Sequence, residues 1–403
     1  MRRPEQSQLF KPAPLPTAEL SDAERLACLR LIRSENVGPV TFRELINHFG
    51  GAQNALDALP DLSRRGGAGR PIRLCSQADA EKELEAASRT GAVSLFTIEP
   101  DYPALLARIE APPPMLYAKG RRELLNMPGI AIVGSRQCSA AGVQLTRRFA
   151  NELAEAGFKI VSGLARGIDR AAHEASLSRG TVAVLAGGID WVYPPEHAEL
   201  QRLIGAEGCL VTERPPGFNP RERDFPRRNR IIAGLAYGVV IVEAAMRSGT
   251  LTTARYANDL GREVFALPGH PLDPRAEGTN RLIKQGATLV TEPSEVIEIL
   301  RPIVGHETFS EPFAEPSFKL PVAPDQLEAH ALASSPGSRQ GGSDGPNKMA
   351  AVLAALGPAP VAVDAIARAT GLTVQSVHIA LLELDLAGRI ERQGLSLVAL
   401  KST

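Results

Sequence analysis

The chain has 403 residues, more than one ordinary domain needs, and its 44% hydrophobic and 22% charged residues are typical of a globular protein, not a disordered or fibrous one. The net charge is +0, so nucleic-acid binding cannot be argued from the total and depends on local patches. The four cysteines lie far apart without a CxxC pair, which excludes a zinc module by spacing and suits a reducing cytosol. No apolar run approaches the roughly 18 residues of a membrane span and the start lacks a signal-peptide core, so we expect a cytoplasmic protein with no membrane segment.

The first part of the chain predicts a flexible tail and then a small helical domain. Residues 1–20 are polar and rich in proline, and residues 21–88 carry helical patterns. Ser21 and Glu24 have the spacing of a capping box, and Gly38-Pro39 forms a turn before an amphipathic helix. A helix-hairpin-helix would bind backbone phosphates through this turn, and a packing or oligomerisation role is the equal alternative.

Residues 89–300 predict a Rossmann-like domain. Short runs rich in valine and isoleucine alternate with helical stretches, and the runs do not alternate between apolar and polar residues. Such runs are typical of strands buried on both faces, and their alternation with helices indicates a doubly wound, mostly parallel sheet. The predicted strands are GIAIVGS, FKIVSGLA, TVAVLAGG, CLVTE, GVVIVEAA, EVFALPG and ATLVT.

The last part of the chain predicts a linker, residues 301–346, and a winged helix-turn-helix, residues 347–403. DNA-reading helices normally carry Arg, Lys, Asn or Gln. The candidate recognition helix, Thr373 to Ala387, has no Lys or Arg and contains Glu383 and Asp385. We therefore expect the winged helix to be a protein-interaction or regulatory module.

Glycine, hydroxyl and arginine residues follow most of the predicted strands. In a doubly wound sheet the carboxyl ends of the strands meet at one edge, where ligands bind near helix N-termini. One such glycine could merely relieve a tight turn, but five such loops at one edge favour an anion pocket. Its predicted residues are Gly134, Ser135, Arg136, Ser162, Gly163, Arg166, Ser248, Gly249 and Thr250.

The loops do not match the common cofactor fingerprints. GSRQCSAAG follows the first strand in place of GxGxxG, and no acidic residue ends the second strand, SGLA. A Walker A lysine is absent as well. We therefore predict neither NAD binding nor ATP hydrolysis, and no cofactor.

The segment Arg214–Arg230 is a local cationic patch. It holds six arginines against Glu222 and Asp224, a net charge of +4 in a neutral chain. Arginines interleaved with Phe225 suit single-stranded DNA, because phosphates pair with arginine while a base stacks on the ring. The alternatives are a surface loop in which salt bridges occupy the arginines, and a Phe225 that only anchors the following helix.

An acid–base set is the second candidate chemistry. Asp169 and His173 lie four residues apart, on one helix face, and Glu243 follows a neighbouring strand. This set would suit a nucleotide glycosidase of the phosphoribohydrolase type, although the run Arg247-Ser248-Gly249-Thr250 lacks the doubled glycine of such enzymes. A helix-capping Asp169 with a packed His173 is the favoured reading, and His173, His197 and His270 have no metal-ligand spacing, so no metal site is predicted.

Eight ordered motifs resemble the DNA-processing protein A (DprA/Smf) family: AIVGSR, SGLARGIDRAAH, AVLAGGIDWVYPPEH, TERPPG, FPRRNRIIAGL, VVIVEAAMRSGTLTTARYA, GREVFALPG and GTNRLIKQGA. The resemblance covers about half the chain strongly, and the N-terminal and C-terminal parts resemble the family's sterile-alpha-motif or helix-hairpin-helix extension and its winged helix. It implies a non-enzymatic protein of natural transformation and recombination that binds single-stranded DNA, protects it and loads a RecA-type recombinase. It also implies a homodimer through the Rossmann domain. The DNA contacts that it implies are Arg136, Ser162 to Arg166, Phe225, Arg227, Arg228, Asn229, Arg230 and Ser248 to Thr250.

Overall fold

The computed structural model describes residues 20–308, 344–393 and 396–401. These residues form two compact units: one combines the described parts of Met1–Cys75 and Pro312–Thr403, and the other is Ser76–Glu311. Residues 1–19 of the predicted tail and 309–343 of the predicted linker lie outside the described residues.

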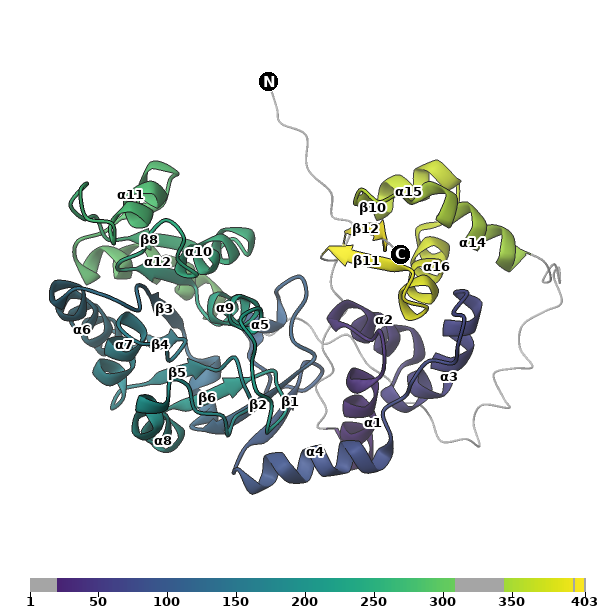
Figure 1. Ribbon diagram of the computed structural model, residues 1–403, viewed down its shortest axis with the longest axis horizontal. Coiled ribbons are helices and arrows are strands. Elements are labelled where there is room, and N and C mark those ends of the chain that lie inside the picture. Colours follow the sequence, from purple (N-terminus) through teal and green to yellow (C-terminus); the bar gives the residue numbers. More distant parts are fainter. Residues whose placement is uncertain (1–19, 309–343, 394–395, 402–403) are drawn as a thin grey trace. The chain divides into compact units, whose positions relative to one another are not determined.

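The central unit is built on a nine-stranded sheet of order β1-β2-β6-β5-β4-β3-β7-β8-β9 (Figure 1). All neighbours from β6 to β9 pair in parallel, which confirms the predicted doubly wound architecture. The seven strands predicted from apolar runs are β3 (Gly129–Val133), β4 (Lys159–Ser162), β5 (Thr181–Val184), β6 (Cys209–Thr212), β7 (Gly238–Ile241), β8 (Glu263–Ala266) and β9 (Thr288–Leu289).

Helices cover both faces of this sheet. Successive residues of one strand enter different cores: Ile130 and Ile132 of β3 pack against one layer of helices, and Ala131 and Val133 against the other. The first layer contains α6 (Ala140–Glu155), α7 (Ile168–Ser176), α8 (Ala198–Glu207) and α12 (Pro293–Thr308). The second contains η1 (Arg122–Asn126), α5 (Ala104–Ala107), α9 (Asp224–Gly234), α10 (Thr250–Asp259) and α11 (Glu277–Lys284).

The N-terminal edge of this unit differs from the sequence-based prediction. Two antiparallel strands, β1 (Val93–Phe96) and β2 (Met115–Gly120), extend the sheet beyond β6. Helix α4 (Gln77–Arg89) lies in the segment expected to belong to the N-terminal helical domain, but it packs against β1 of the central unit. Its Glu83 accepts a 2.5 Å hydrogen bond from the hydroxyl of Tyr117. At the other end, α12 runs past residue 301, where the predicted linker begins, because Val296 and Leu300 anchor it in the core.

The second unit joins the two ends of the chain. Its N-terminal helices are α1 (Asp22–Arg33), α2 (Pro39–Phe49) and α3 (Ala52–Arg65). The Ser21 hydroxyl caps α1 as predicted, but the Glu24 side chain reaches the amide of Ala52, 2.5 Å away, so the capping box is only half formed. The C-terminal elements confirm the winged helix: α14 (Asp344–Ala355), α15 (Val363–Thr370) and α16 (Val374–Leu386), with a sheet of β10 (Val361–Ala362), β12 (Leu397–Leu400) and β11 (Ile390–Gln393).

Helix α16, the candidate recognition helix, packs against α2 and α3. Arg392 is the centre of this interface: its guanidinium donates to both carboxylate oxygens of Glu44, at 2.8 and 2.9 Å, and to Asp385, at 3.1 Å. Thr41 donates to Asp385 at 2.6 Å, and Arg65 pairs with Glu383 at 2.8 Å. The acidic residues of this helix are therefore engaged by the N-terminal helices of the same chain.

Within the described residues, no single helix has the length and apolar composition to cross a membrane. Helices α15 and α16 pass the same test of length and apolar composition only when taken together, and the pair is bent by 114°.

Candidate functional site

The structure brings three predicted loops together at the carboxyl edge of the sheet. The Thr250 hydroxyl donates to the carbonyl of Gly134, at 3.0 Å, and so ties the loop after β7 to the loop after β3. The amide of Ile168 donates to the carbonyl of Ser135, at 3.2 Å, and joins the loop after β4 to them. A side chain on Gly167 could not be accommodated there, because a Cβ atom would lie 2.3 Å from the Ser135 oxygen.

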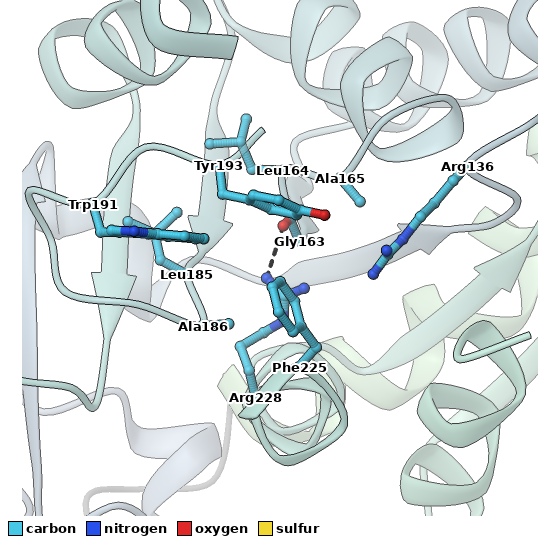
Figure 2. A pocket seen from close by; sticks show the side chains of 10 residues that line it. All are labelled: Arg136, Gly163, Leu164, Ala165, Leu185, Ala186, Trp191, Tyr193, Phe225 and Arg228. Carbon is cyan, nitrogen blue, oxygen red and sulfur yellow. Dashed lines mark hydrogen bonds between the residues drawn. The ribbon is translucent and has the colours of Figure 1, made fainter. Parts of the chain in front are cut away.

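Aromatic and cationic side chains surround a small hollow at this edge (Figure 2). Trp191 and Tyr193 stack with ring centroids 5.1 Å apart and planes 15° from parallel. Phe225 lies 5.4 Å from Tyr193, and the Arg136 guanidinium lies 5.7 Å from the centre of the Phe225 ring. The hollow measures about 20 Å³, room for a water but not for a base, so a base would stack on the outer faces of these rings.

Arg136 and Arg228 both line this hollow but differ in their surroundings. Arg136 is exposed, and in the described parts of the chain its side chain has no hydrogen bond or ion pair. Arg228 is 6% exposed; it donates to the carbonyl of Gly163 at 2.7 Å and also to that of Val184. Burial lowers the pKa of Arg228 to about 10, so it stays charged at neutral pH. Arg136 can meet a phosphate directly, whereas Arg228 positions the loop after β4.

Three buried side chains order the loop that follows β4. Leu164 has a left-handed φ of 55°, a conformation that costs free energy for a residue other than glycine. Its amide donates to Nε2 of His173 at 3.3 Å, and its carbonyl accepts from Nδ1 of His197 at 3.1 Å. Asp169 accepts from the amides of Gly163 and Ala165, at 3.1 and 3.3 Å. These contacts hold a strained turn against the aromatic hollow.

The proposed acid–base set is used in this internal ordering. Burial, with Arg228 and His197 nearby, lowers the pKa of His173 to about 3, so the ring is neutral. Its Nδ1 lies 2.7 Å from the Thr181 hydroxyl, which completes its hydrogen bonds. Glu243 accepts hydrogen bonds from the amide and the hydroxyl of Ser139, at 3.0 and 2.5 Å. None of the three lines the hollow, and the described residues contain no cluster of potential metal ligands.

The hydroxyls predicted to bind an anion are also engaged within the fold. Ser162 is fully buried and donates to the carbonyl of Ile132 at 2.6 Å. Ser248 donates to Thr250 at 2.9 Å, and Asn229 donates to the carbonyl of Gly249 at 3.2 Å. These side chains hold the loops in place. Because they are engaged in the fold, the backbone of the loops is what remains available to bind a ligand.

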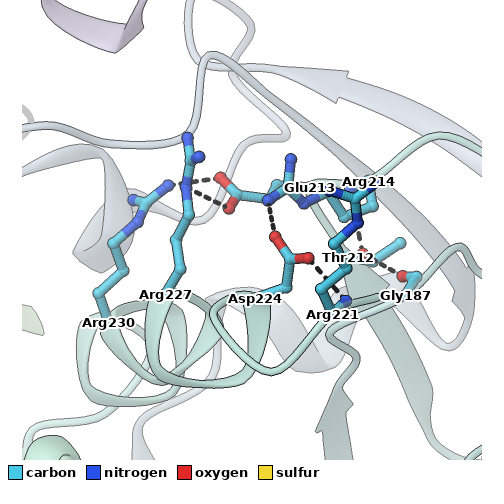
Figure 3. Close-up of polar contacts among 8 residues, drawn as sticks. All are labelled: Gly187, Thr212, Glu213, Arg214, Arg221, Asp224, Arg227 and Arg230. Carbon is cyan, nitrogen blue, oxygen red and sulfur yellow. Dashed lines mark hydrogen bonds and ion pairs between the residues drawn. The ribbon is translucent and has the colours of Figure 1, made fainter. Parts of the chain in front are cut away.

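Ion pairs divide the arginines of the cationic patch (Figure 3). Arg230 pairs with Glu213 and donates to the carbonyl of Ala111 at 3.0 Å, and only 15% of its side chain is exposed. Arg227 lies 3.4 Å from Glu213 but remains 53% exposed. Arg166 pairs with Glu196 and is 56% exposed; hydrogen bonding from Arg166 lowers the pKa of Glu196 to about 2. The alternative in which salt bridges occupy the arginines of the patch thus applies to Arg230. Arg227 of the patch, and Arg166 outside it, can exchange a carboxylate for a phosphate.

Trp191 and Tyr193 are site residues that the sequence analysis missed. They lie in the run DWVYPPEH, which follows the strand TVAVLAGG. Two aromatic residues two positions apart, in a loop at the ligand edge of a sheet, are the signal that could have identified them.

Comparison with known proteins shows which family the sequence belongs to. A model described as DNA recombination-mediator protein A matches residues 94–301, more than half of the chain. The chain belongs to the DprA/Smf family. Family models for a DprA-like N-terminal HHH domain and a DprA winged helix domain match residues 22–86 and 340–394.

Individual proteins with these names are similar to the chain. Protein Smf of Synechocystis is 34% identical over 390 residues, which cover 93% of this chain and 98% of that protein. The X-ray structure of DprA from Streptococcus pneumoniae is 35% identical with a TM-score of 0.60, over 68% of this chain and 96% of that one. DNA processing protein A of Helicobacter pylori, for which a single-stranded DNA binding mode is described, is 31% identical with a TM-score of 0.48, over 53% and 96%.

Proposed function

We propose that this DprA/Smf protein binds single-stranded DNA at the edge formed by Arg136, Tyr193 and Phe225. The observation that carries the proposal is the exposed Arg136 guanidinium beside a cluster of three aromatic rings. Aromatic faces stack on unpaired bases, and arginine neutralises the adjoining phosphate. A duplex does not offer such unpaired faces, because its bases are stacked on one another.

Binding at this edge is independent of DNA sequence. Every base has a face that can stack on Tyr193 or Phe225, and the surrounding donors are arginines and backbone amides. In this proposal Arg136 meets a phosphate and Arg228 donates to backbone carbonyls, so neither arginine of the aromatic hollow reads the edge of a base.

The wider role in this proposal is in recombination during natural transformation. The family is described as recombination mediators, which supports a function in protecting incoming DNA and in loading a RecA-type recombinase. The proposal includes a homodimer formed through the Rossmann domain. Within the described residues the four cysteines form no disulfide with one another, which supports action in the reducing cytoplasm.

The function that we propose includes no catalysed reaction. Asp169 and His173 are directed at backbone groups of the loop at residues 163–165, which leaves neither free to transfer a proton to a ligand in the aromatic hollow. A nucleotide glycosidase that uses the same edge is the second candidate, on the strength of the anion-binding loops alone.

The test is a fluorescence anisotropy titration with single- and double-stranded oligonucleotides at several salt concentrations, run beside an assay for release of free base. Tight binding of single strands without turnover supports the proposal, and release of base selects the glycosidase. Arg136→Ala should weaken binding and lower the salt slope by about 0.7, the loss expected for one phosphate contact with a single strand. The control is Arg122→Ala, an exposed arginine in η1 with no side-chain partner in the described residues. Equal salt slopes for Arg136→Ala and the control would place the DNA elsewhere.

A further inference from the structure

A second hollow lies beside the aromatic one. It measures about 400 Å³ and is lined by Arg214, Phe218, Asn219, Arg221, Arg223, Asp224 and Arg227. Pockets for small molecules have volumes of about 300–1,000 Å³, so this hollow is large enough for a nucleotide. Phe225 and Arg228 of α9 line the aromatic hollow, while Asp224 and Arg227 line the second one. The two hollows therefore occupy adjacent faces of the first turn of one helix.

The charge of the second hollow is only partly compensated. Arg214 pairs with Asp224 and Arg227 lies 3.4 Å from Glu213 (Figure 3). The side chains of Arg221 and Arg223 are different: both residues are exposed, and within the described ranges neither has a hydrogen bond or an ion pair. A surplus of guanidinium groups around a concave surface attracts an anion with several oxygen acceptors.

The wall of the hollow is held in shape by contacts that leave these cations free. Asp190 accepts two hydrogen bonds from the amide of Gly217, at 2.8 and 3.1 Å, where φ is 76° and a side chain would be strained. The amide of Gly188 donates to the carbonyl of Phe218 at 2.9 Å. Asp224, which is 5% exposed, accepts from the backbone amide of Arg221 at 2.9 Å. The loop is thus ordered before any ligand arrives, which lowers the entropic cost of binding.

An aromatic ring completes the hollow. The Arg214 guanidinium lies 4.6 Å from the centre of the Phe218 ring, and Phe218 is half-buried. Arg214 and Phe218 together provide a flat surface on which a base or sugar can rest, next to cations that can hold a phosphate.

We propose that this second hollow is a nucleotide subsite, in which Arg221 and Arg223 bind a phosphate and Phe218 packs against the sugar or base. The inference rests on the proposed function, and in that setting the occupant is a nucleotide of the strand that stacks on Tyr193 and Phe225. A free nucleotide has the same chemistry, and the experiment separates the two sources.

The test compares the double variant Arg221→Ala/Arg223→Ala with the wild type in binding oligothymidylates of increasing length. For long oligomers we expect affinity at physiological salt to fall about tenfold and the salt slope to fall by about 1.4, for two lost contacts at about 0.7 each. Trp191 is the sole tryptophan of the chain, and its fluorescence reports stacking in the aromatic hollow. Its quenching at saturating DNA should remain that of the wild type, because the first contact is retained.

The matched control is Arg122→Ala/Arg301→Ala, which removes two exposed arginines from η1 and α12 of the same unit. It should leave affinity and salt slope close to the wild-type values. An equal loss in both double variants would mean that net charge alone matters and would overturn the subsite. If Arg221→Ala/Arg223→Ala binds both DNA and thymidine 5′-monophosphate as the wild type does, the subsite is overturned as well.

Thymidine 5′-monophosphate alone, measured by calorimetry, distinguishes the two sources. Binding of the mononucleotide that is lost in Arg221→Ala/Arg223→Ala, with DNA affinity unchanged, would assign the hollow to a free nucleotide. Loss of DNA affinity with negligible mononucleotide binding would assign it to the strand. If the wild type binds no single-stranded DNA, the proposed function fails, and mononucleotide binding then decides the subsite independently.

Discussion

Arg228 donates from Nη1 to the carbonyl oxygen of Gly163 at 2.7 Å, and this hydrogen bond ties α9 to the end of β4. The guanidinium is buried, so truncation leaves the carbonyls of Gly163 and Val184 without their donor. We expect Arg228→Ala to lower the free energy of unfolding by about 3 kcal/mol. Urea denaturation followed by Trp191 fluorescence measures this. A loss below about 0.5 kcal/mol would contradict the positioning role.

Arg136→Ala is the matched comparison for Arg228→Ala. Its side chain is exposed, contacts the Phe225 ring and has no hydrogen bond or ion pair in the described residues, so we expect stability to change by less than about 0.5 kcal/mol. The family resemblance implies DNA contacts for both arginines, but Arg228 is buried, so we expect only Arg136→Ala to lower the salt slope. Full stability with weakened DNA binding in Arg228→Ala would restore the original expectation.

Tyr193 is expected to supply stacking free energy without charge. Tyr193→Ala should weaken binding of single-stranded DNA by about tenfold, since stacking of one base is worth about 1–3 kcal/mol. The salt slope should not change, and Tyr193→Phe should bind as the wild type does. Anisotropy titrations at several salt concentrations test all three statements. A changed slope in Tyr193→Ala would indicate that the variant had displaced Arg136.

His173 gives stability a defined pH dependence. Its folded pKa of about 3 lies below the ordinary 6.5, so between these values the unfolded state binds a proton that the folded state does not. The unfolding free energy should therefore fall by about 2 kcal/mol between pH 6.5 and 5 from this residue. Burial raises the pKa of Asp169, which acts in the opposite direction, so the effect is taken as the difference between wild type and His173→Gln. Parallel pH profiles would refute it.

Glu44 and Arg392 should be strongly coupled. Arg392 is only 7% exposed and faces two carboxylates, so Arg392→Ala leaves two half-buried negative charges without this cation and should destabilise the unit by about 3 kcal/mol. A double-mutant cycle with Glu44→Ala should give a coupling of more than about 1 kcal/mol. Hydrogen exchange of the α16 amides provides the readout, and Arg368→Ala, on the exposed side of α15, is the control. Additive effects would show that the pair does not hold the interface.

Deletion of residues 346–403 should leave affinity for single-stranded DNA largely intact. The acidic residues of α16 bind the N-terminal helices, and the helix has no Lys or Arg to offer a phosphate. An anisotropy titration of the truncated chain tests this, and a tenfold loss of affinity would contradict it.

The strands of the central sheet could be predicted because burial on both faces leaves a continuous apolar run in the sequence. Strands β1 and β2 escaped prediction because they pair antiparallel beside the parallel strands and lie outside the regular alternation of strand and helix that indicated the sheet. The cations of the patch were visible in the sequence, but their exposure was not. Arg227 and Arg228 are adjacent, yet one is 53% exposed and the other buried, because α9 turns by about 100° per residue against the sheet.

The candidate site could likewise be predicted only in part from the sequence. Phe225 was recognisable from its arginine neighbours, whereas Trp191 and Tyr193 reach it from a loop more than 30 residues earlier in the chain. Contacts that form only in the tertiary fold, such as that of Tyr193 with Phe225, cannot be predicted from the local sequence around either residue.

The joining of the two chain ends in one unit has a consequence for synthesis. The ribosome makes α1 to α3 first and α16 last, with the whole Rossmann domain between them. Until the final residues emerge, Thr41 and Glu44 lack Asp385 and Arg392. A chain that ends before α16 therefore carries the complete Rossmann domain together with helices α2 and α3, whose partner helix is missing.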